Sequence, residues 1–172
     1  MLFQILYAII RQNVTKLNGI TTGEIVMIRP ITKDDFIDYM AMATEFYHSD
    51  AVLHPIPESH IEQTFKEVTT LSLYTEGYLF EYHGKAAGYS LLAKTYSQEA
   101  GGMVLWIEEL YVRPEYRNKG LGSAFFGFLE NKAKNQVVRI RLEVDEDNEK
   151  AMALYERMGY RPLHYRQMYK GK

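Results

Sequence analysis

The chain has 172 residues, 20 basic and 22 acidic side chains that give a net charge of −2, and no cysteine. A single domain with a sizeable core is expected from this length. Without cysteine there is no disulfide framework, no thiolate metal site and no cysteine nucleophile. Without a broad basic field, nucleic-acid binding is not expected as the main task.

The N-terminal segment is the first patterned stretch of the chain. Residues 2–17 place their apolar side chains on one helical stripe, which predicts a docked amphipathic helix without chemistry of its own. The stretch is too short to cross a bilayer, which takes about 20 residues, and it lacks the features of a signal peptide. We therefore expect an N-terminal extension over residues 1–23, a single domain over residues 24–172, and a cytoplasmic protein with no membrane partner.

The domain begins with a strand and two helices. The strand is predicted over residues 24–29, and the helices over residues 32–48 and 58–69. The first helix should turn these side chains inward: Phe36, Met40, Ala43, and Phe46 or Tyr47. Strands are predicted over residues 78–82 and 86–94, with His83 and Gly84 forming a tight hairpin turn between them.

The second half of the domain is built around one strand, turn and helix. An apolar strand is predicted over residues 104–112, and Pro114 ends it because proline has no N–H for a ladder. The next helix carries an inward face at helical spacing: Leu121, Phe125, Phe128 and Leu129. A strand over 137–144, a helix over 148–158 and a last strand over 160–169 complete the order β-α-α-β-β-β-α-β-α-β.

The turn before that helix has the pattern Arg-x-x-Gly-x-Gly, from Arg117 through Gly120 to Gly122. It is neither the glycine pattern of dinucleotide-binding folds nor a P-loop. The free N–H groups and the dipole of a helix start form an anion site, which suits phosphate. A helix start whose glycines serve only close packing is the alternative interpretation.

The last helix places Asn148 and Tyr155 seven residues apart, which is about two turns, so the two side chains share a face. An amide and a phenol beside a groove could bind a ligand. An ordinary N-cap for Asn148 and a core position for Tyr155 explain the same residues.

Together the two motifs resemble the GNAT N-acetyltransferase superfamily. The first is Arg117-x-x-Gly120-x-Gly122, and the second runs from Asn148 through Tyr155 to Gly159-Tyr160. The resemblance covers the element order from residue 24 onward and is specific over residues 107–160. It implies an α/β GNAT fold with a central mixed, mostly antiparallel sheet and helices on both faces. Strands four and five of that sheet would be parallel and splayed, with acetyl-CoA between them as cosubstrate.

The resemblance also implies roles for individual residues. The pantetheine arm and the acetyl carbonyl would be held by backbone groups of Leu110, Tyr111 and Val112. The pyrophosphate would be cradled by the residues of the turn: Arg117, Asn118, Lys119, Gly120, Leu121 and Gly122, with Ser123 close by. Asn148 would meet the pantetheine region. Tyr155 would be the general acid that protonates the departing CoA thiolate.

An amine acceptor needs a base, because an alkyl amine with a pKa of about 10 is protonated at pH 7 and cannot attack. Glu108 and Glu109 are neighbours on the central strand and should point to opposite faces. The segment Ile-Glu-Glu-Leu-Tyr-Val over 107–112 looks like the Leu-Glu-Asp-Phe-Phe-Val segment of polyamine acetyltransferases, so Glu108 is the predicted base. A bulge in this strand could reverse the choice. Alternatively, both carboxylates are solvated or paired with Arg139 or Arg141.

These implications predict an enzyme that transfers the acetyl group of acetyl-CoA to a primary amine, small or polyamine-like, by direct attack in a ternary complex. The alternatives are a non-catalytic acetyl-CoA-sensing module and a protein or peptide N-acetyltransferase. The resemblance implies that the loop over 47–54 helps to line the acceptor pocket. Its aromatic rings and Asp50 suit a cationic amine, although ordinary loop chemistry explains the same residues. No metal is predicted, because no cluster has ligand spacing. A homodimer is expected through the strand edge at 163–169.

Overall fold

The computed structural model describes residues 26–49, 51–52, 54–70, 72–134 and 137–170. The strands are β1 (Val26–Pro30), β2 (Thr75–Tyr82), β3 (Lys85–Ser97), β4 (Gly102–Val112) and β5 (Arg139–Leu142). The α-helices are α2 (Phe36–Tyr47), α3 (Glu58–Val68), α4 (Leu121–Ala133) and α5 (Glu149–Arg157), and short 3-10 turns lie at η1 (Lys33–Asp35) and η2 (Pro114–Tyr116). The helix predicted over residues 2–17 lies outside the described residues. None of the described helices is long and apolar enough to cross a membrane.

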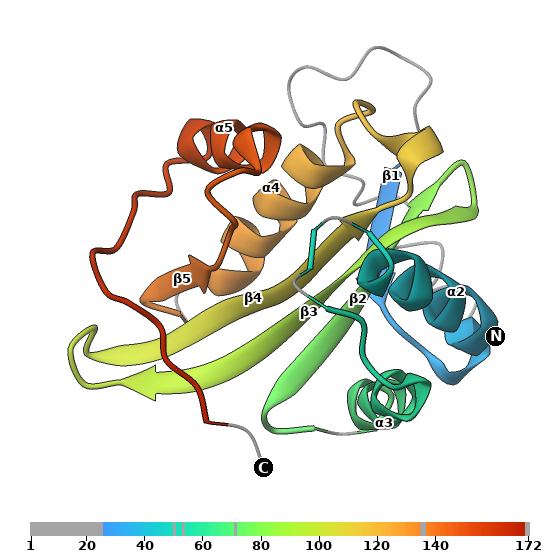
Figure 1. Cartoon of the computed structure of the whole chain (residues 1–172), viewed down its shortest axis with the longest axis horizontal. Helices are drawn as coiled ribbons and strands as arrows, with labels where there is room; N and C mark the ends of the chain where they lie inside the picture. Colours follow the sequence, from blue (N-terminus) through green and yellow to red (C-terminus); the bar gives the residue numbers. More distant parts are fainter. Residues whose placement is uncertain (1–25, 50, 53, 71, 135–136, 171–172) are drawn as a thin grey trace, which may run out of the picture.

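The five strands form one mixed sheet in the order β1-β2-β3-β4-β5 (Figure 1). The first four are antiparallel neighbours, and β5 pairs with β4 in parallel. The hairpin predicted between β2 and β3 is confirmed, since His83 and Gly84 have φ angles of 51° and 75°, as the favoured two-residue turn requires. The mixed, mostly antiparallel α/β fold is therefore confirmed.

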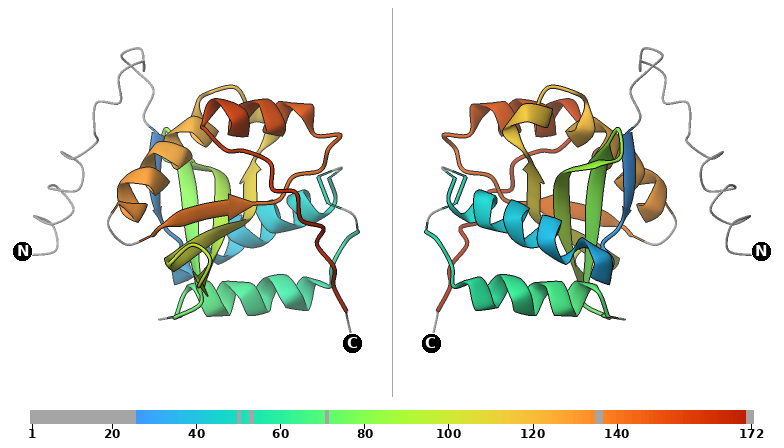
Figure 2. Two further views of the ribbon diagram at one scale, coloured as in Figure 1. Left: turned by 90° about the vertical axis from the view of Figure 1, so that its left-hand side faces the viewer. Right: turned by 90° about the vertical axis from the view of Figure 1, so that its right-hand side faces the viewer.

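Helices cover both faces of the sheet (Figure 2). On one face α2 and α3 bury a cluster that includes Tyr39, Phe65 and Tyr89. On the other face α4 buries a second cluster around Phe125, against which α5 packs. Phe36, predicted to point inward, is 42% exposed, because its ring reaches only the edge of Phe65 at a centroid distance of 5.1 Å.

A β-bulge interrupts β4. Leu91 of β3 lies opposite Glu109, but the next residue, Leu92, lies opposite Ile107, so Glu108 is the extra residue. Before the bulge, Ile107 faces the α4 cluster; after it, Tyr111 faces the α2 cluster. Strict alternation would keep these two residues on one face. The bulge therefore turns the end of β4 over, as bulges do next to functional sites.

The prediction of a last strand over residues 160–169 is wrong. After α5 the chain runs as far as residue 170 without regular secondary structure (Figure 1). Its apolar side chains are exposed, with Leu163 at 50%, Tyr165 at 74% and Tyr169 at 92%. A strand needs a partner for its ladder, and no described strand pairs with this segment. The neighbouring β5 is itself shorter than predicted and spans only Arg139–Leu142.

Candidate functional site

The parallel strands β4 and β5 part at the bulge. They pair only from Val104 opposite Arg139 to Ile107 opposite Leu142. From residue 108 to residue 112, the β5 side of β4 has no partner among the described strands. An unpaired strand edge presents backbone N–H and C=O groups that an extended ligand can bind. This is the gap in which the sequence analysis placed the pantetheine arm.

The three residues predicted to bind through their backbone lie along this gap. Leu110 and Val112 turn their side chains toward the α4 cluster. Tyr111 is buried in the α2 cluster, and its hydroxyl donates to Glu45 at 3.0 Å. The Nε of Arg117 donates to the carbonyl oxygen of Val112 at 3.1 Å. With the side chains turned to the two cores, the backbone is what these residues can offer to a ligand in the gap.

The start of α4 is an uncapped helix N-terminus. Gly120 is the N-cap residue in the left-handed region, with φ 77°, and no side chain caps the helix. The first backbone hydrogen bond of the helix is donated by the Ala124 N–H to the Gly120 carbonyl oxygen, at 2.8 Å. Asn118 also has a positive φ, of 61°. Uncapped N–H groups at a helix start form an anion site.

The two glycines of the turn have different functions. A Cβ on Gly120 would meet no atom within 4 Å, so this position is open to a ligand. A Cβ on Gly122 would come within 3.2 Å of a Leu154 methyl group, so Gly122 allows α4 to pack closely on α5. The open position of Gly120 is compatible with the anion-site interpretation, and the close contact at Gly122 is compatible with the packing interpretation.

Two cations flank the turn without an anionic partner. Arg117 is exposed, and the Lys119 ammonium lies over the rings of Tyr82 and Tyr116 at 4.8 and 5.3 Å. Neither cation forms an ion pair with any described residue. The Leu121 side chain is buried, so it can offer only its N–H, while Ser123 is exposed. Unpaired cations beside a helix start strengthen an anion site.

Asn148 is the N-cap of α5, as one interpretation of the sequence predicted. Its Oδ1 accepts from the Ala151 N–H at 3.2 Å. The amide nitrogen of Asn148 has no partner within the described part of the chain. Capping therefore uses one end of this amide and leaves its donor end for a ligand.

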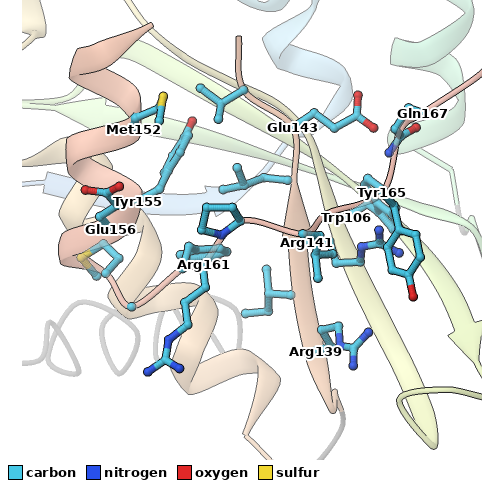
Figure 3. Close-up of a pocket in the computed structure, with 18 of the residues that line it drawn as sticks. Trp106, Arg139, Arg141, Glu143, Met152, Tyr155, Glu156, Arg161, Tyr165 and Gln167 are labelled. Atoms are coloured by element: carbon cyan, nitrogen blue, oxygen red, sulfur yellow. The ribbon is translucent and has the colours of Figure 1, made fainter. Parts of the chain in front are cut away.

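Tyr155 packs between α4 and the chain after α5. Its ring meets Phe126 edge-on at 5.8 Å and Tyr160 at 6.1 Å. Figure 3 shows the side chain projecting from α5 toward β5, and no described residue hydrogen-bonds its hydroxyl. Burial raises the pKa of Tyr155 above its ordinary value. The phenol therefore keeps its proton at neutral pH, as a general acid must.

The adjacent carboxylates have different surroundings. Glu108 is exposed at the bulge, and no hydrogen bond or ion pair to its carboxylate is found in the described structure. Partial burial and the negative charge of Glu143 raise the pKa of Glu108. Neither Glu108 nor Glu109 pairs with the arginines of β5: Arg139 bonds Glu99 at 3.2 Å, and Arg141 lies over the Trp106 ring. The pairing alternative therefore does not hold for the described residues.

Glu109 is half-buried, and its carboxylate lies between two phenols. Its Oε1 accepts from the Tyr47 hydroxyl at 2.6 Å, and its Oε2 accepts from the Tyr89 hydroxyl at 2.5 Å. Burial raises the pKa of Glu109, the two phenols oppose that rise, and the charge of Glu108 adds to it. This cluster was not predicted from the sequence, because Tyr47 and Tyr89 lie far from Glu109 in the chain. The possibility of a bulge was the only signal for it.

Two cavities lie near these groups. One of about 270 Å³ follows α2 and is lined by Tyr47, His48, Ser49, Val52, His54 and Pro55. It matches most of the predicted acceptor loop, although Asp50 is outside the described residues. A cavity of about 1560 Å³ lies between α5, β5 and residues 160–168 (Figure 3). Tyr155 lines it, but no residue of the glycine turn does, and it exceeds the usual size of small-ligand pockets, about 300–1,000 Å³.

Part of the chain is similar to characterised enzymes. It is 35% identical to the thialysine N-epsilon-acetyltransferase of Bos taurus over 77 residues, which are 44% of this chain and 45% of that protein. The corresponding enzyme of Caenorhabditis elegans is 35% identical over 75 residues, 43% of this chain and 46% of that protein. The chain thus spans less than half the length of the curated relatives it matches.

Solved structures share the fold over most of the chain. The aminoglycoside N-acetyltransferase AAC(6')-Iy, crystallised with CoA, superposes with a TM-score of 0.72 at 13% identity, covering 89% of this chain and 99% of that one. At such identity the likeness concerns the fold alone. The model of the acetyltransferase (GNAT) family matches residues 39–160. The chain belongs to this acetyltransferase family.

Proposed function

We propose that this GNAT acetyltransferase transfers the acetyl group of acetyl-CoA to a small primary amine, by direct attack of the amine in a ternary complex. One observation carries the proposal: the unpaired edge of β4 has an unpartnered carboxylate, Glu108, at its start, and an uncapped helix start at Gly120 follows its end. A base and an anion site at the two ends of one unpaired strand edge fit a substrate that carries both a reactive group and a phosphate.

The cosubstrate would be held along this strand edge by residues of three kinds. Backbone groups of Leu110, Tyr111 and Val112 would bind the pantetheine arm. The pyrophosphate would lie against the turn residues Arg117, Asn118, Lys119, Gly120, Leu121 and Gly122, with Ser123 in the first turn of the helix. The free amide nitrogen of Asn148 supports a contact to the pantetheine region. Bound acetyl-CoA supplies the activated acetyl group.

Two side chains would handle the protons. Glu108 would take a proton from the bound ammonium, directly or through water, and its raised pKa supports this role. Tyr155 would donate its proton to the departing thiolate, and its unbonded hydroxyl supports this. No acyl-enzyme on cysteine is available, because the chain has no cysteine.

Small amines are favoured as acceptors over peptides. The cavity at the end of α2 has a volume of about 270 Å³, close to that of the smallest pockets that bind small molecules, about 300 Å³. The names of two similar proteins, a thialysine acetyltransferase and an aminoglycoside acetyltransferase, also refer to small amines. Tyr47 brings a phenol and His48 an imidazole to the wall of this cavity.

The test is an acetyl-CoA consumption assay over a panel of diamines, polyamines, lysine analogues, aminoglycosides and short peptides. We expect turnover with at least one small amine. If acetyl-CoA raises the melting temperature but no amine is acetylated, the chain is a cofactor-sensing module and the proposal is wrong. If the peptides are the preferred substrates, the chain is a protein or peptide N-acetyltransferase instead.

We also propose a homodimer. Four large apolar side chains of the last segment are exposed in the monomer: Leu163, Tyr165, Met168 and Tyr169. The outer edge of β5 has no neighbour among the described strands. Exposed apolar side chains beside an open sheet edge favour association with a second copy.

A further inference from the structure

Two phenols hold the Glu109 carboxylate, one on each oxygen. Tyr89, fully buried on β3, donates to one carboxylate oxygen, and Tyr47, the last residue of α2, donates to the other. The two donors differ in position. Tyr89 is enclosed in the sheet core, whereas Tyr47 is half-buried at the rim.

Tyr47 contacts both the cavity at the end of α2 and the bulge of β4. It lines the cavity of about 270 Å³ at the end of α2, and it bonds Glu109 across 62 positions of sequence. Its ring also packs edge-on against Phe46 at 5.2 Å. A single O–H···O bond of 2.6 Å therefore connects the wall of the acceptor cavity to the bulge of β4.

The carboxylates at the bulge lack a counter-charge. No Lys, Arg or His in the described residues forms an ion pair with Glu108 or Glu109. Removing a carboxylate from water, even in part, is costly unless it is paired or hydrogen-bonded. The two phenols supply hydrogen bonds but no positive charge, so a cationic ligand entering beside Tyr47 would meet a fixed negative field.

We propose that Tyr47 is a positioning residue that sets the affinity for the acceptor amine. Its bond to Glu109 holds the cavity wall at a fixed distance from the bulge, so that a cationic amine bound in the cavity reaches Glu108. The inference rests on the proposed function and deepens it by naming the hydrogen bond that fixes the wall of the acceptor cavity to β4. Without this bond the wall is free to move, and the amine is held less well.

The test compares Tyr47→Phe with Tyr89→Phe. Each variant keeps its ring and deletes one phenol from the same carboxylate, but only Tyr47 lines the cavity. Hydrogen bonds to charged groups are among the stronger ones, so we expect the amine KM of Tyr47→Phe to rise roughly 10-fold. Its kcat and its KM for acetyl-CoA should stay within about twofold of wild type. Tyr89→Phe should change the amine KM by no more than about twofold.

A second variant shows whether Tyr47 acts through Glu109. In a Glu109→Gln background, Tyr47→Phe should add much less than its roughly 10-fold effect in the wild type, because the two residues form one unit. Equal KM increases in Tyr47→Phe and Tyr89→Phe would overturn the inference, since the cavity wall would then be irrelevant. An unchanged amine KM in Tyr47→Phe, with an active wild type, would overturn it while leaving the proposed function intact. A wild type that acetylates no amine would contradict both.

Discussion

The anion site at the start of α4 can be tested by one substitution with a matched control. Gly120 has φ 77°, and a Cβ there would meet no atom within 4 Å, so a side chain fits without a clash. Gly120→Asp places a negative charge where pyrophosphate is proposed to bind. Gly120→Asn adds a side chain of nearly the same size and the same backbone strain, but no charge. Both Asp and Asn tolerate the left-handed region better than most residues.

The expected effect follows from linkage. At about 100 times its Kd, a ligand that binds only the folded state stabilises it by about 2.7 kcal/mol. For a chain of 172 residues, each kcal/mol shifts the Tm by about 2–4 °C. Acetyl-CoA should therefore raise the wild-type Tm by roughly 5–11 °C. The positive φ should lower the ligand-free Tm of both variants by a similar few degrees, because its cost is about 1 kcal/mol.

The assay is thermal unfolding of the wild type and both variants, with and without acetyl-CoA. We expect the ligand shift to vanish in Gly120→Asp and to persist, at least in part, in Gly120→Asn. A full shift in Gly120→Asp would refute the assigned site. Equal loss in both variants would mean that side-chain bulk rather than charge excludes the ligand.

Three further predictions concern the proton-transfer groups and assembly. Tyr155→Phe should lower kcat by roughly 10²–10⁴ without changing the acetyl-CoA shift; full activity would return Tyr155 to a purely packing role. Glu108→Gln should lower kcat/KM most at neutral pH and less at high pH, where free amine is abundant, whereas the effect of Glu109→Gln should fall on the amine KM at every pH. A larger, pH-dependent kcat loss in Glu109→Gln would make that residue the base, and small losses in both would mean that water or a backbone group takes the proton. Light scattering at tens of micromolar should give a dimer mass, and a monomer mass would contradict the assembly proposal.

The central unit was predictable because its signals are local. Pro114 marks the end of β4, and the glycines mark the turn into α4, within a dozen residues. The positive φ of Gly120 is the kind of conformation that glycine signals directly. The His83-Gly84 hairpin was predictable for the same reason.

The bulge at Glu108 could not be predicted, because it depends on how β4 pairs with β3. No glycine or proline interrupts the run from Gly102 to Val112, and the irregularity shows only as Leu91 and Leu92 facing Glu109 and Ile107. The bulge then decides which core each following side chain meets. The bonds from Tyr47 and Tyr89 to Glu109 depend on this register and on the packing of α2.

The last strand was wrongly predicted for a related reason. Leu163, Tyr165 and Tyr169 would share one face of a strand and indicate a face that prefers burial, but they do not say whether a partner strand is present. Among the described residues, β5 is only four residues long, and residues 163–169 do not pair with its outer edge. Sequence pattern predicts what a strand would bury, whereas pairing is a property of the whole sheet.

The central claim is acetyl transfer from acetyl-CoA to an amine, and product analysis tests it most directly. The wild-type chain is incubated with acetyl-CoA carrying an isotopic label in the acetyl group and with the best amine of the panel. Released CoA thiol and labelled product are then measured in the same sample by absorbance and mass spectrometry. The account predicts one labelled amide for each CoA released, with both signals strongly reduced in Glu108→Gln at neutral pH. CoA release accompanied only by labelled acetate, or cofactor binding without CoA release, would contradict it.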